Sequence, residues 1–196
     1  MKLLEFEFKG DRKYIHGPDI FNRAYKEAEA DLGGTLNSVK LSCRSMAKTN
    51  LFWTKELYQE KEVMSIFDVE NSGLKTKYYL YAAKSVIENS YPYFETDIIE
   101  NSVFDYESNV ASIKNYDRYS VSEISVALLK ELCKHSISNS VKWIFVGLDI
   151  KFPIELFTLN TIEVEIEKNI GTKMVVASLR IGSKIIGNMK FSSHAK

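Results

Sequence analysis

A five-residue segment occurs twice in this chain and limits the folds that the chain can adopt. Asn37-Ser38-Val39-Lys40-Leu41 recurs about half the chain length later as Asn139-Ser140-Val141-Lys142-Trp143. A second pair of matching segments, Asp11-Arg12-Lys13-Tyr14 and Asp117-Arg118-Tyr119, precedes the first pair at a similar offset. A helix-like stretch separates the two matches in each half. The sequence therefore predicts two copies of one supersecondary unit.

Each half contains one segment with the pattern of a helix that is buried on one face. In the first half, Pro18 suits a first helical turn and Gly33 supplies a stop, which predicts a helix from Pro18 to Leu32. In the second half, Ser120 and Glu123 form a capping-box pattern, which predicts a helix at Ser122 to Lys134. Aligning the two helices places Asp19 on Glu123. The apolar residues at helical spacing are Ile20, Phe21, Ala24, Tyr25 and Ala28, and then Ile124, Ala127, Leu128 and Leu132.

Short apolar segments after each helix predict antiparallel strands, because several alternate in polarity and Gly-containing turns separate them. One strand is also expected before each helix, at Leu3 to Phe8 and at about Ile98 to Tyr106. The chain is expected to divide into units 1–96 and 97–196, joined through Ser90 to Thr96. The strands expected after the helices are Ser38 to Met46, Leu51 to Tyr58, Val63 to Val69 and Lys77 to Val86, and then Val141 to Phe152, Thr161 to Glu167, Lys173 to Ile181 and Lys184 to Ser192.

Composition excludes several classes of function. Basic and acidic side chains both number 26, so the chain lacks the net positive charge of a nucleic-acid binder. No apolar run approaches the roughly 20 residues of a membrane span, and Met1 to Phe8 alternates like a strand instead of a signal peptide. A cytoplasmic location is the resulting expectation. Cys43 and Cys133 have neither disulfide nor zinc-site spacing, so buried reduced thiols are expected. The sequence has no phosphate-binding Gly loop and no metal-ligand cluster, so no cofactor and no metal are expected.

The order of one strand, a long buried helix and an antiparallel run of strands resembles the hotdog fold. With the duplication, essentially the whole chain resembles a double hotdog of the α+β class, in which the halves of the usual hotdog dimer are fused as a pseudo-dimer. The resemblance implies a thioesterase or hydroxyacyl dehydratase acting on an acyl-CoA or acyl-carrier-protein thioester. It implies a site between the units near the start of the central helix, and it is compatible with a further homo-oligomer of the fused pair.

The segment Tyr14 to Asn22 is where such a site would fall. His16, Asp19 and Glu123 are the predicted catalytic residues, because thioester chemistry needs an imidazole or carboxylate to move a proton. Glu123 would supply the opposing carboxylate from the second unit. Exposed amides of the first helical turn would polarise the thioester carbonyl oxygen. The residues predicted to bind substrate are Tyr14, Gly17 and Asn22.

The chain also departs from the two catalytic patterns of the resembled enzymes. In the dehydratase pattern an acid follows the catalytic His on the partner helix, and the corresponding position is Ala30 here. In the hydroxybenzoyl-CoA thioesterase pattern an Asp precedes a Gly-His-Val-Asn-Asn run, whose composition His16 to Asp19 only partly shares. Helix-dipole stabilisation alone would account for Asp19, and a cap alone for Glu123. A non-catalytic double hotdog that binds an acyl chain or a partner protein is therefore the alternative function.

Overall fold

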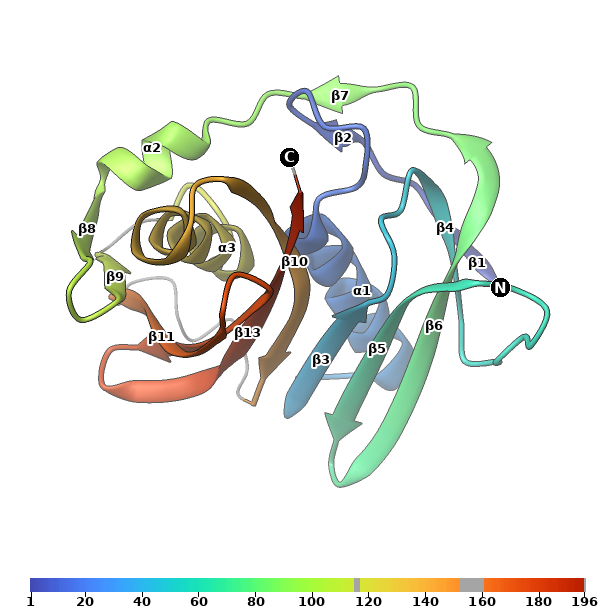
Figure 1. Ribbon diagram of the computed structural model, residues 1–196. Coiled ribbons are helices and arrows are strands. Elements are labelled where there is room, and N and C mark those ends of the chain that lie inside the picture. Colours follow the sequence, from blue (N-terminus) through green and yellow to red (C-terminus); the bar gives the residue numbers. More distant parts are fainter. Residues whose placement is uncertain (115–116, 152–160, 196) are drawn as a thin grey trace. The chain divides into compact units, whose positions relative to one another are not determined.

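The computed structural model describes residues 1–114, 117–151 and 161–195. The chain divides into two compact units, Met1–Tyr93 and Phe94–Lys196. Each unit combines an antiparallel sheet with a helix that lies on it (Figure 1). The α+β class predicted from the sequence is therefore confirmed.

The first unit holds one long helix, one main sheet and a short separate pair of strands. In the main sheet the strands follow the order β1-β4-β6-β5-β3, and every neighbouring pair is antiparallel. Strands β2 and β7 form the separate pair, which is parallel. The elements of this unit are β1 (Lys2–Leu4), β2 (Phe8–Lys9), α1 (Gly17–Leu32), β3 (Ser38–Cys43), β4 (Thr49–Thr54), β5 (Val63–Asn71), β6 (Leu74–Val86) and β7 (Ser90–Tyr91).

Helix α1 begins one residue before its predicted start and ends where predicted. Gly33 caps it with φ 66°, a left-handed conformation that Gly adopts without steric cost. Below the helix the ring of Phe21 meets Phe67 of β5 edge-on at 5.9 Å between centroids. The apolar residues predicted to form the buried face are all buried: Ile20, Phe21, Ala24, Tyr25 and Ala28.

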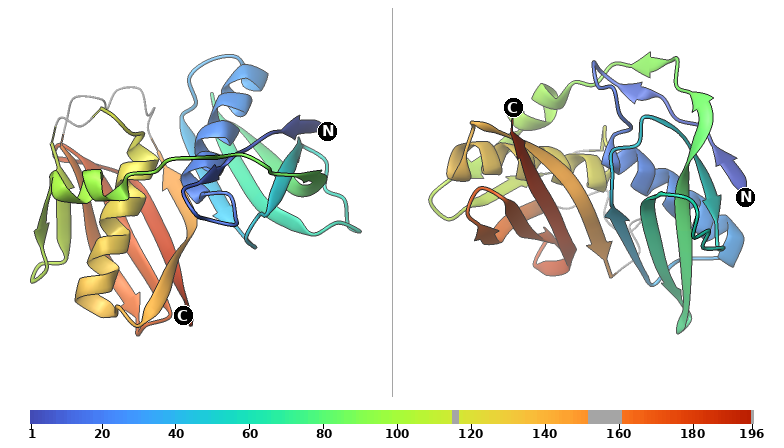
Figure 2. Two further views of the ribbon diagram at one scale, coloured as in Figure 1. Left: turned by 90° about the horizontal axis from the view of Figure 1, so that it is seen from above. Right: turned by 45° about the vertical axis from the view of Figure 1, so that its right-hand side comes forward.

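The second unit has its own central helix, α3, which packs on β9, β10 and β11. Its strands follow the order β8-β9-β11-β12-β13-β10 with antiparallel neighbours. Figure 2 shows α3 along one face of this sheet from two further directions. The elements are α2 (Glu95–Glu100), β8 (Ser102–Asp105), β9 (Val110–Ile113), α3 (Val121–Leu132), the π-helical turn η1 (Cys133–Ile137), β10 (Val141–Ile150), β11 (Ile162–Ile170), β12 (Met174–Ile181) and β13 (Lys184–Ala195).

Two predicted strands are wrong in part. The segment expected to be a strand at Ile98 to Tyr106 begins inside helix α2, whose end is closed when the Ser102 hydroxyl donates to the Ile98 carbonyl. The strand is limited to β8, and the sequence reading missed β9 after it. The strand expected at Leu3 to Phe8 is split into β1 and β2, because the Phe6 amide leaves the ladder and donates to the Asn50 side chain at 2.8 Å.

The remaining boundaries differ by a few residues. Helix α3 ends at Leu132, two residues before its predicted end, where the chain enters the π-helical turn. The first predicted strand of the second unit reaches Ile150, and its expected last residue, Phe152, lies outside the described residues. Strand ends are the least determined part of a pattern-based reading, because the apolar alternation continues into the turns.

The two units share the order of their elements along the chain but not the full order of their sheets. In the second unit the short turns at 171–173 and 182–183 make β11, β12 and β13 successive neighbours. In the first unit only β5 and β6 are joined by a tight turn, whereas the longer segment 55–62 lets β5 pair on the far side of β6. The duplicated segments Asn37–Leu41 and Asn139–Trp143 lead into corresponding strands, β3 and β10.

Gly187 provides a test of the second sheet. A Cβ atom at this position would lie 1.9 Å from the Asp149 carbonyl oxygen of the neighbouring strand, and backbone cannot move away cheaply. We expect Gly187→Ala to lower the free energy of unfolding by about 2 kcal/mol or more, measured by urea denaturation. Lys190→Ala, an exposed change in the same strand, should stay within about 0.5 kcal/mol of the wild type. Equal midpoints for the two variants would contradict the strand pairing.

A second test concerns the contact between the end of α1 and the first sheet. Asp31 accepts a 2.5 Å hydrogen bond from the Tyr78 hydroxyl and pairs with Lys55 at 2.7 Å. The bonds from Lys55 and Tyr78 lower the pKa of Asp31 below its ordinary 3.8. This contribution to stability is therefore present above pH 3.8 and is lost as the pH falls through the folded pKa.

We therefore expect Asp31→Asn to be less stable than the wild type at neutral pH, and the difference to close as the solution is acidified below pH 3.8. Urea midpoints measured across this range would check it. Asp68→Asn, in a longer 3.2 Å pair with Lys77, serves as the control and should change little. A difference between wild type and Asp31→Asn that does not vary with pH would assign the contribution to packing.

Candidate functional site

The start of helix α1 places His16 in a buried position of the first unit. His16 is the residue before the helix, with extended backbone angles of φ −65° and ψ 133°, and its side chain is 6% exposed. The Ile15 amide beside it donates to the Ala47 carbonyl at 2.8 Å, which ties this approach to the segment between β3 and β4. The imidazole ring lies 5.6 Å from the ring of Tyr93, measured between centroids.

The backbone donors at this helix end are fewer than the sequence suggested. The amides of Asp19 and Ile20 both donate to the His16 carbonyl, at 3.0 and 3.3 Å. Pro18 has no amide hydrogen. Among the first-turn residues, all of which are described, Gly17 thus has the one amide that the helix itself does not engage. Several helix amides were expected to be available to polarise a carbonyl oxygen. The structure leaves the Gly17 N–H for that role, together with the positive end of the helix dipole.

Asp19, at the third position of α1, is held by two neighbours. Its Oδ2 atom accepts a 2.9 Å hydrogen bond from the Tyr91 hydroxyl. Its Oδ1 atom lies 3.7 Å from the Lys9 ammonium nitrogen. Lys9 is 1% exposed, so the ion pair is almost fully removed from water on the lysine side. Asp19 therefore joins the helix to strands β2 and β7.

Aromatic rings surround the buried lysine. The Lys9 ammonium lies 4.2 Å from the Tyr93 ring centroid and 5.5 Å from that of Tyr91, within cation–π range. The guanidinium of Arg12 lies 5.2 Å from the same Tyr93 ring and donates to the Lys9 carbonyl at 3.1 Å. Cations and aromatic rings thus stabilise each other where water is excluded. We call Lys9, Arg12, His16, Asp19, Tyr91 and Tyr93 the helix-mouth cluster.

Sequence reasoning found His16 and Asp19 but missed the rest of this cluster. The sequence pattern gives no role to Lys9 and indicates only a junction between the units for the aromatic segment around Pro92. The two tyrosines that flank Pro92 could have indicated a packing role for this segment, because a flexible linker rarely carries two aromatic residues so close together. Tyr14, Gly17 and Asn22 lie in the same segment as His16 and are each partly exposed. Their predicted role in substrate binding stays a prediction.

Glu123 occupies the corresponding position of the second unit, the third residue of α3, and forms the capping box predicted as its structural role. The Ser120 amide and hydroxyl both donate to Glu123 Oε2, at 2.9 and 2.6 Å. The Glu123 amide returns a 3.3 Å bond to the Ser120 hydroxyl. This geometry explains Glu123 as a helix cap, and its predicted catalytic role stays a prediction.

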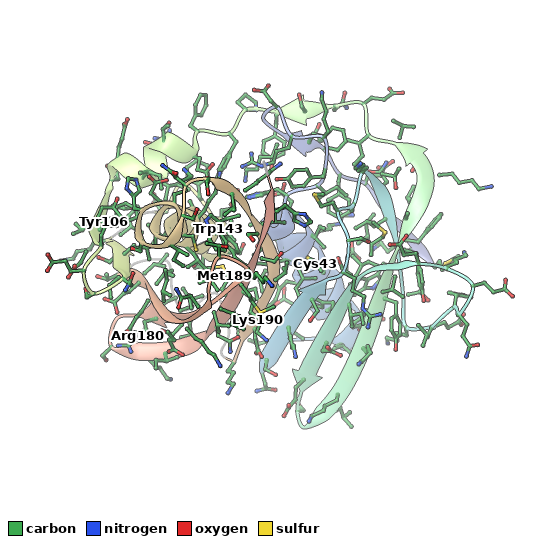
Figure 3. The ribbon with its side chains drawn as sticks, viewed as in Figure 1. Cys43, Tyr106, Trp143, Arg180, Met189 and Lys190 are labelled. Atoms are coloured by element: carbon green, nitrogen blue, oxygen red, sulfur yellow. The ribbon has the colours of Figure 1, made fainter. Side chains whose placement is uncertain are left out.

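The other histidines have ordinary surroundings. His135 lies in the π-helical turn, where its ring nitrogen is 3.0 Å from Glu131 and its ring packs at a tilt of 31° on that of Tyr106, with 4.8 Å between centroids (Figure 3 labels Tyr106). His194 is exposed near the end of β13. Their environments give them structural or solvated roles, and among the three histidines the buried one is His16.

Neither cysteine has the chemistry of an acyl-transfer nucleophile. Both are free thiols, and Figure 3 shows Cys43 on β3. Burial raises the pKa of Cys43 to about 11 and that of Cys133 to about 12, so both are protonated at neutral pH. The described part of the chain contains no group of three or more His, Cys, Asp or Glu side chains placed to hold a metal ion. No helix among the described residues is long and apolar enough to cross a membrane.

Comparison with known proteins identifies the fold. No protein-family model matches the sequence, and no curated protein matches it significantly. Among solved structures, the tesB protein of Mycobacterium avium subsp. paratuberculosis aligns over 98% of this chain and 96% of its own, with 7% identity and a TM-score of 0.52. The dehydratase domain of PpsC from Mycobacterium tuberculosis aligns over 98% of this chain and 93% of its own, with 11% identity and a TM-score of 0.52. The chain has the hotdog fold.

The capping box gives a test of Glu123. We expect Ser120→Ala to cost about 1 kcal/mol in the free energy of unfolding, because the first turn loses its side-chain acceptor. Glu123→Gln should be nearly neutral, since Gln also serves at this position of a capping box. Urea denaturation checks both, with the exposed Ser183→Ala as the control. Destabilisation of Glu123→Gln by as much as Ser120→Ala would contradict this account of the capping box.

Proposed function

We propose that this protein is a double hotdog that processes acyl thioesters, with its reactive centre at the helix-mouth cluster. The fold likeness supports this, because the solved structures described above are named as a tesB protein and as a dehydratase domain, the latter in complex with C12:1-CoA. Both align over nearly all of this chain, which supports a hotdog unit in each half. The substrate class is an acyl group carried by coenzyme A or by an acyl carrier protein.

The observation that carries the proposal is the buried imidazole of His16 immediately before helix α1. A neutral imidazole there can accept a proton from a water molecule as the water attacks the thioester carbonyl carbon. The Gly17 amide and the helix dipole stabilise the negative charge that develops on the carbonyl oxygen. Collapse of the tetrahedral intermediate breaks the carbon–sulfur bond and leaves the carboxylic acid. The departing thiolate takes the proton from the imidazolium and is released as the thiol.

Hydrolysis fits the helix-mouth cluster better than dehydration. Dehydration of a hydroxyacyl thioester needs a base for the α proton and also an acid that protonates the departing hydroxyl. Asp19, the carboxyl group of the cluster, already accepts a hydrogen bond from Tyr91 and pairs with the Lys9 ammonium, so each of its oxygens has a structural partner. These contacts favour a structural role for Asp19 and leave His16 as the proton-transfer group of the cluster. Hydrolysis needs only the imidazole and the oxyanion donor.

A non-catalytic acyl-binding or protein-interaction module is the second candidate. One observation favours it: the contacts of Asp19 and Glu123 within their own units each give the carboxylate a structural role. In that case the helix mouth would bind a thioester carbonyl without turning it over. The two functions differ in whether substrate is consumed.

A panel of thioesters separates these functions. The purified protein would be mixed with saturated acyl-CoA and 3-hydroxyacyl-CoA of short to long chain, and with the same acyl groups on an acyl carrier protein. Release of free thiol reports hydrolysis, and new absorbance of the enoyl thioester reports dehydration. Binding detected by calorimetry without either product would favour the module. The absence of both binding and turnover across the whole panel would contradict the proposal.

His16 is the residue to change. We expect His16→Ala to reduce turnover at least 100-fold, the usual scale for a lost general acid or base, with the fold retained in far-UV circular dichroism. His194→Ala removes an exposed imidazole and is the matched control, which should keep wild-type turnover. Full activity in His16→Ala would remove His16 from the mechanism.

A further inference from the structure

Lys9 is an unusual residue to find buried in a short strand. Its side chain is 1% exposed, and its charge lies beside Asp19 and over the ring of Tyr93. A buried ion pair costs desolvation that its attraction scarcely repays, and an apolar pair of similar volume is often equally stable or more so. Stability alone therefore does not account for Lys9. Unlike apolar residues, the ion pair can fix the orientation of the helix that carries Asp19.

The contacts of Asp19 show what is being fixed. One carboxylate oxygen lies near Lys9 of β2 and the other accepts from Tyr91 of β7, so the start of α1 is held from two strands at once. These two strands are themselves joined, because Lys9 pairs with Tyr91 in the parallel ladder and the Gly10 amide donates to the Tyr91 carbonyl at 2.8 Å. A hydrogen bond to one carboxylate oxygen and an ion pair to the other restrict the rotation of the first helical turn.

The same groups reach His16 through Tyr93. The centroid of the Tyr93 ring lies 4.2 Å from the Lys9 ammonium and 5.6 Å from the centroid of the imidazole, so one ring packs near both groups. His16 is also only three residues before Asp19, and its carbonyl accepts the Asp19 amide at 3.0 Å. A shift of Asp19 would therefore move both the backbone of His16 and the ring beside it.

We propose that Lys9 and Tyr91 are positioning residues, which hold the start of α1 through Asp19 and thereby fix the imidazole of His16. The proposal deepens the function proposed above and rests on it, because a fixed imidazole direction matters when a thioester must be aligned with it. Asp19 then acts as the anchor of the helix mouth, and the proton is moved by His16.

The chain offers a direct readout of the imidazole that needs no substrate. It contains only three histidines, so selective isotope labelling of histidine gives a spectrum in which His16, His135 and His194 can each be assigned by single substitutions. Tyr91→Phe removes one hydroxyl and keeps the ring. We expect it to shift and broaden the His16 ring signals while the signals of His135 and His194 stay in place.

Further variants separate positioning from general disturbance. Lys9→Met should move the His16 signals further than Tyr91→Phe does, and Lys9→Arg, which keeps the charge, should bring them back toward the wild-type position. Tyr79→Phe removes a hydroxyl on β6 outside the cluster and should leave all three histidines unchanged. His16 signals that coincide with the wild type in both Tyr91→Phe and Lys9→Met would overturn the proposal, and Tyr91→Phe alone decides if Lys9→Met does not fold.

Kinetics provide the second readout if a thioester substrate is found. Misplacing a reacting group lowers kcat and changes KM little. Tyr91→Phe should therefore reduce kcat by about 10-fold or more and leave KM within about twofold of the wild-type value. Failure of the proposed function would look different: no thioester is turned over by the wild type, yet the His16 signals still move in Tyr91→Phe. If the wild type turns over a thioester but the His16 signals do not move in either variant, the positioning role is wrong and the proposed activity stands.

Discussion

The burial of one helix face on an antiparallel sheet is the interaction on which the rest of each unit depends. In the first unit Phe21 packs edge-on against Phe67, and Trp53 stacks on Tyr78 at 4.1 Å beside it. A helix of this length is marginal by itself in water, so its position is set by the apolar surface it shares with the sheet. The helix-mouth cluster exists because that packing brings the first turn of α1 to β2 and β7.

Features that depend on local sequence could be predicted well. The stripe from Ile20 to Ala28 repeats with the helical period, and the Ser120–Glu123 capping box needs only residues three apart, so both were confirmed. The hotdog resemblance followed from the order of such elements. Helix α2 was missed because its six residues are too short to show a period, and its end depends on the Ser102 hydroxyl meeting the Ile98 carbonyl.

The site could be predicted only where it lies close in sequence. His16 and Asp19 flank Pro18 and were found together, whereas Lys9 and Tyr91 come together through a ladder between segments that are far apart along the chain. A lysine in a short strand normally faces water, so sequence gives no sign that Lys9 is buried. Likewise, the sheet order of the first unit depends on which partner β5 reaches after the segment 55–62, and periodicity carries no information about that.

The parallel pairing of β2 with β7 also sets when the helix mouth can form. Phe8 pairs with Ser90 and Lys9 with Tyr91, so nearly all of the first unit must leave the ribosome before this ladder closes. Contacts between residues so distant in sequence form slowly, because the chain loses conformational entropy when the long loop between them closes. A nascent chain that stops before Ser90 would still contain α1 and its sheet, but His16 would have no Tyr93 beside it. The candidate site therefore cannot assemble until Tyr91 and Tyr93 have been synthesised, and a pause in synthesis after β6 would leave the site incomplete.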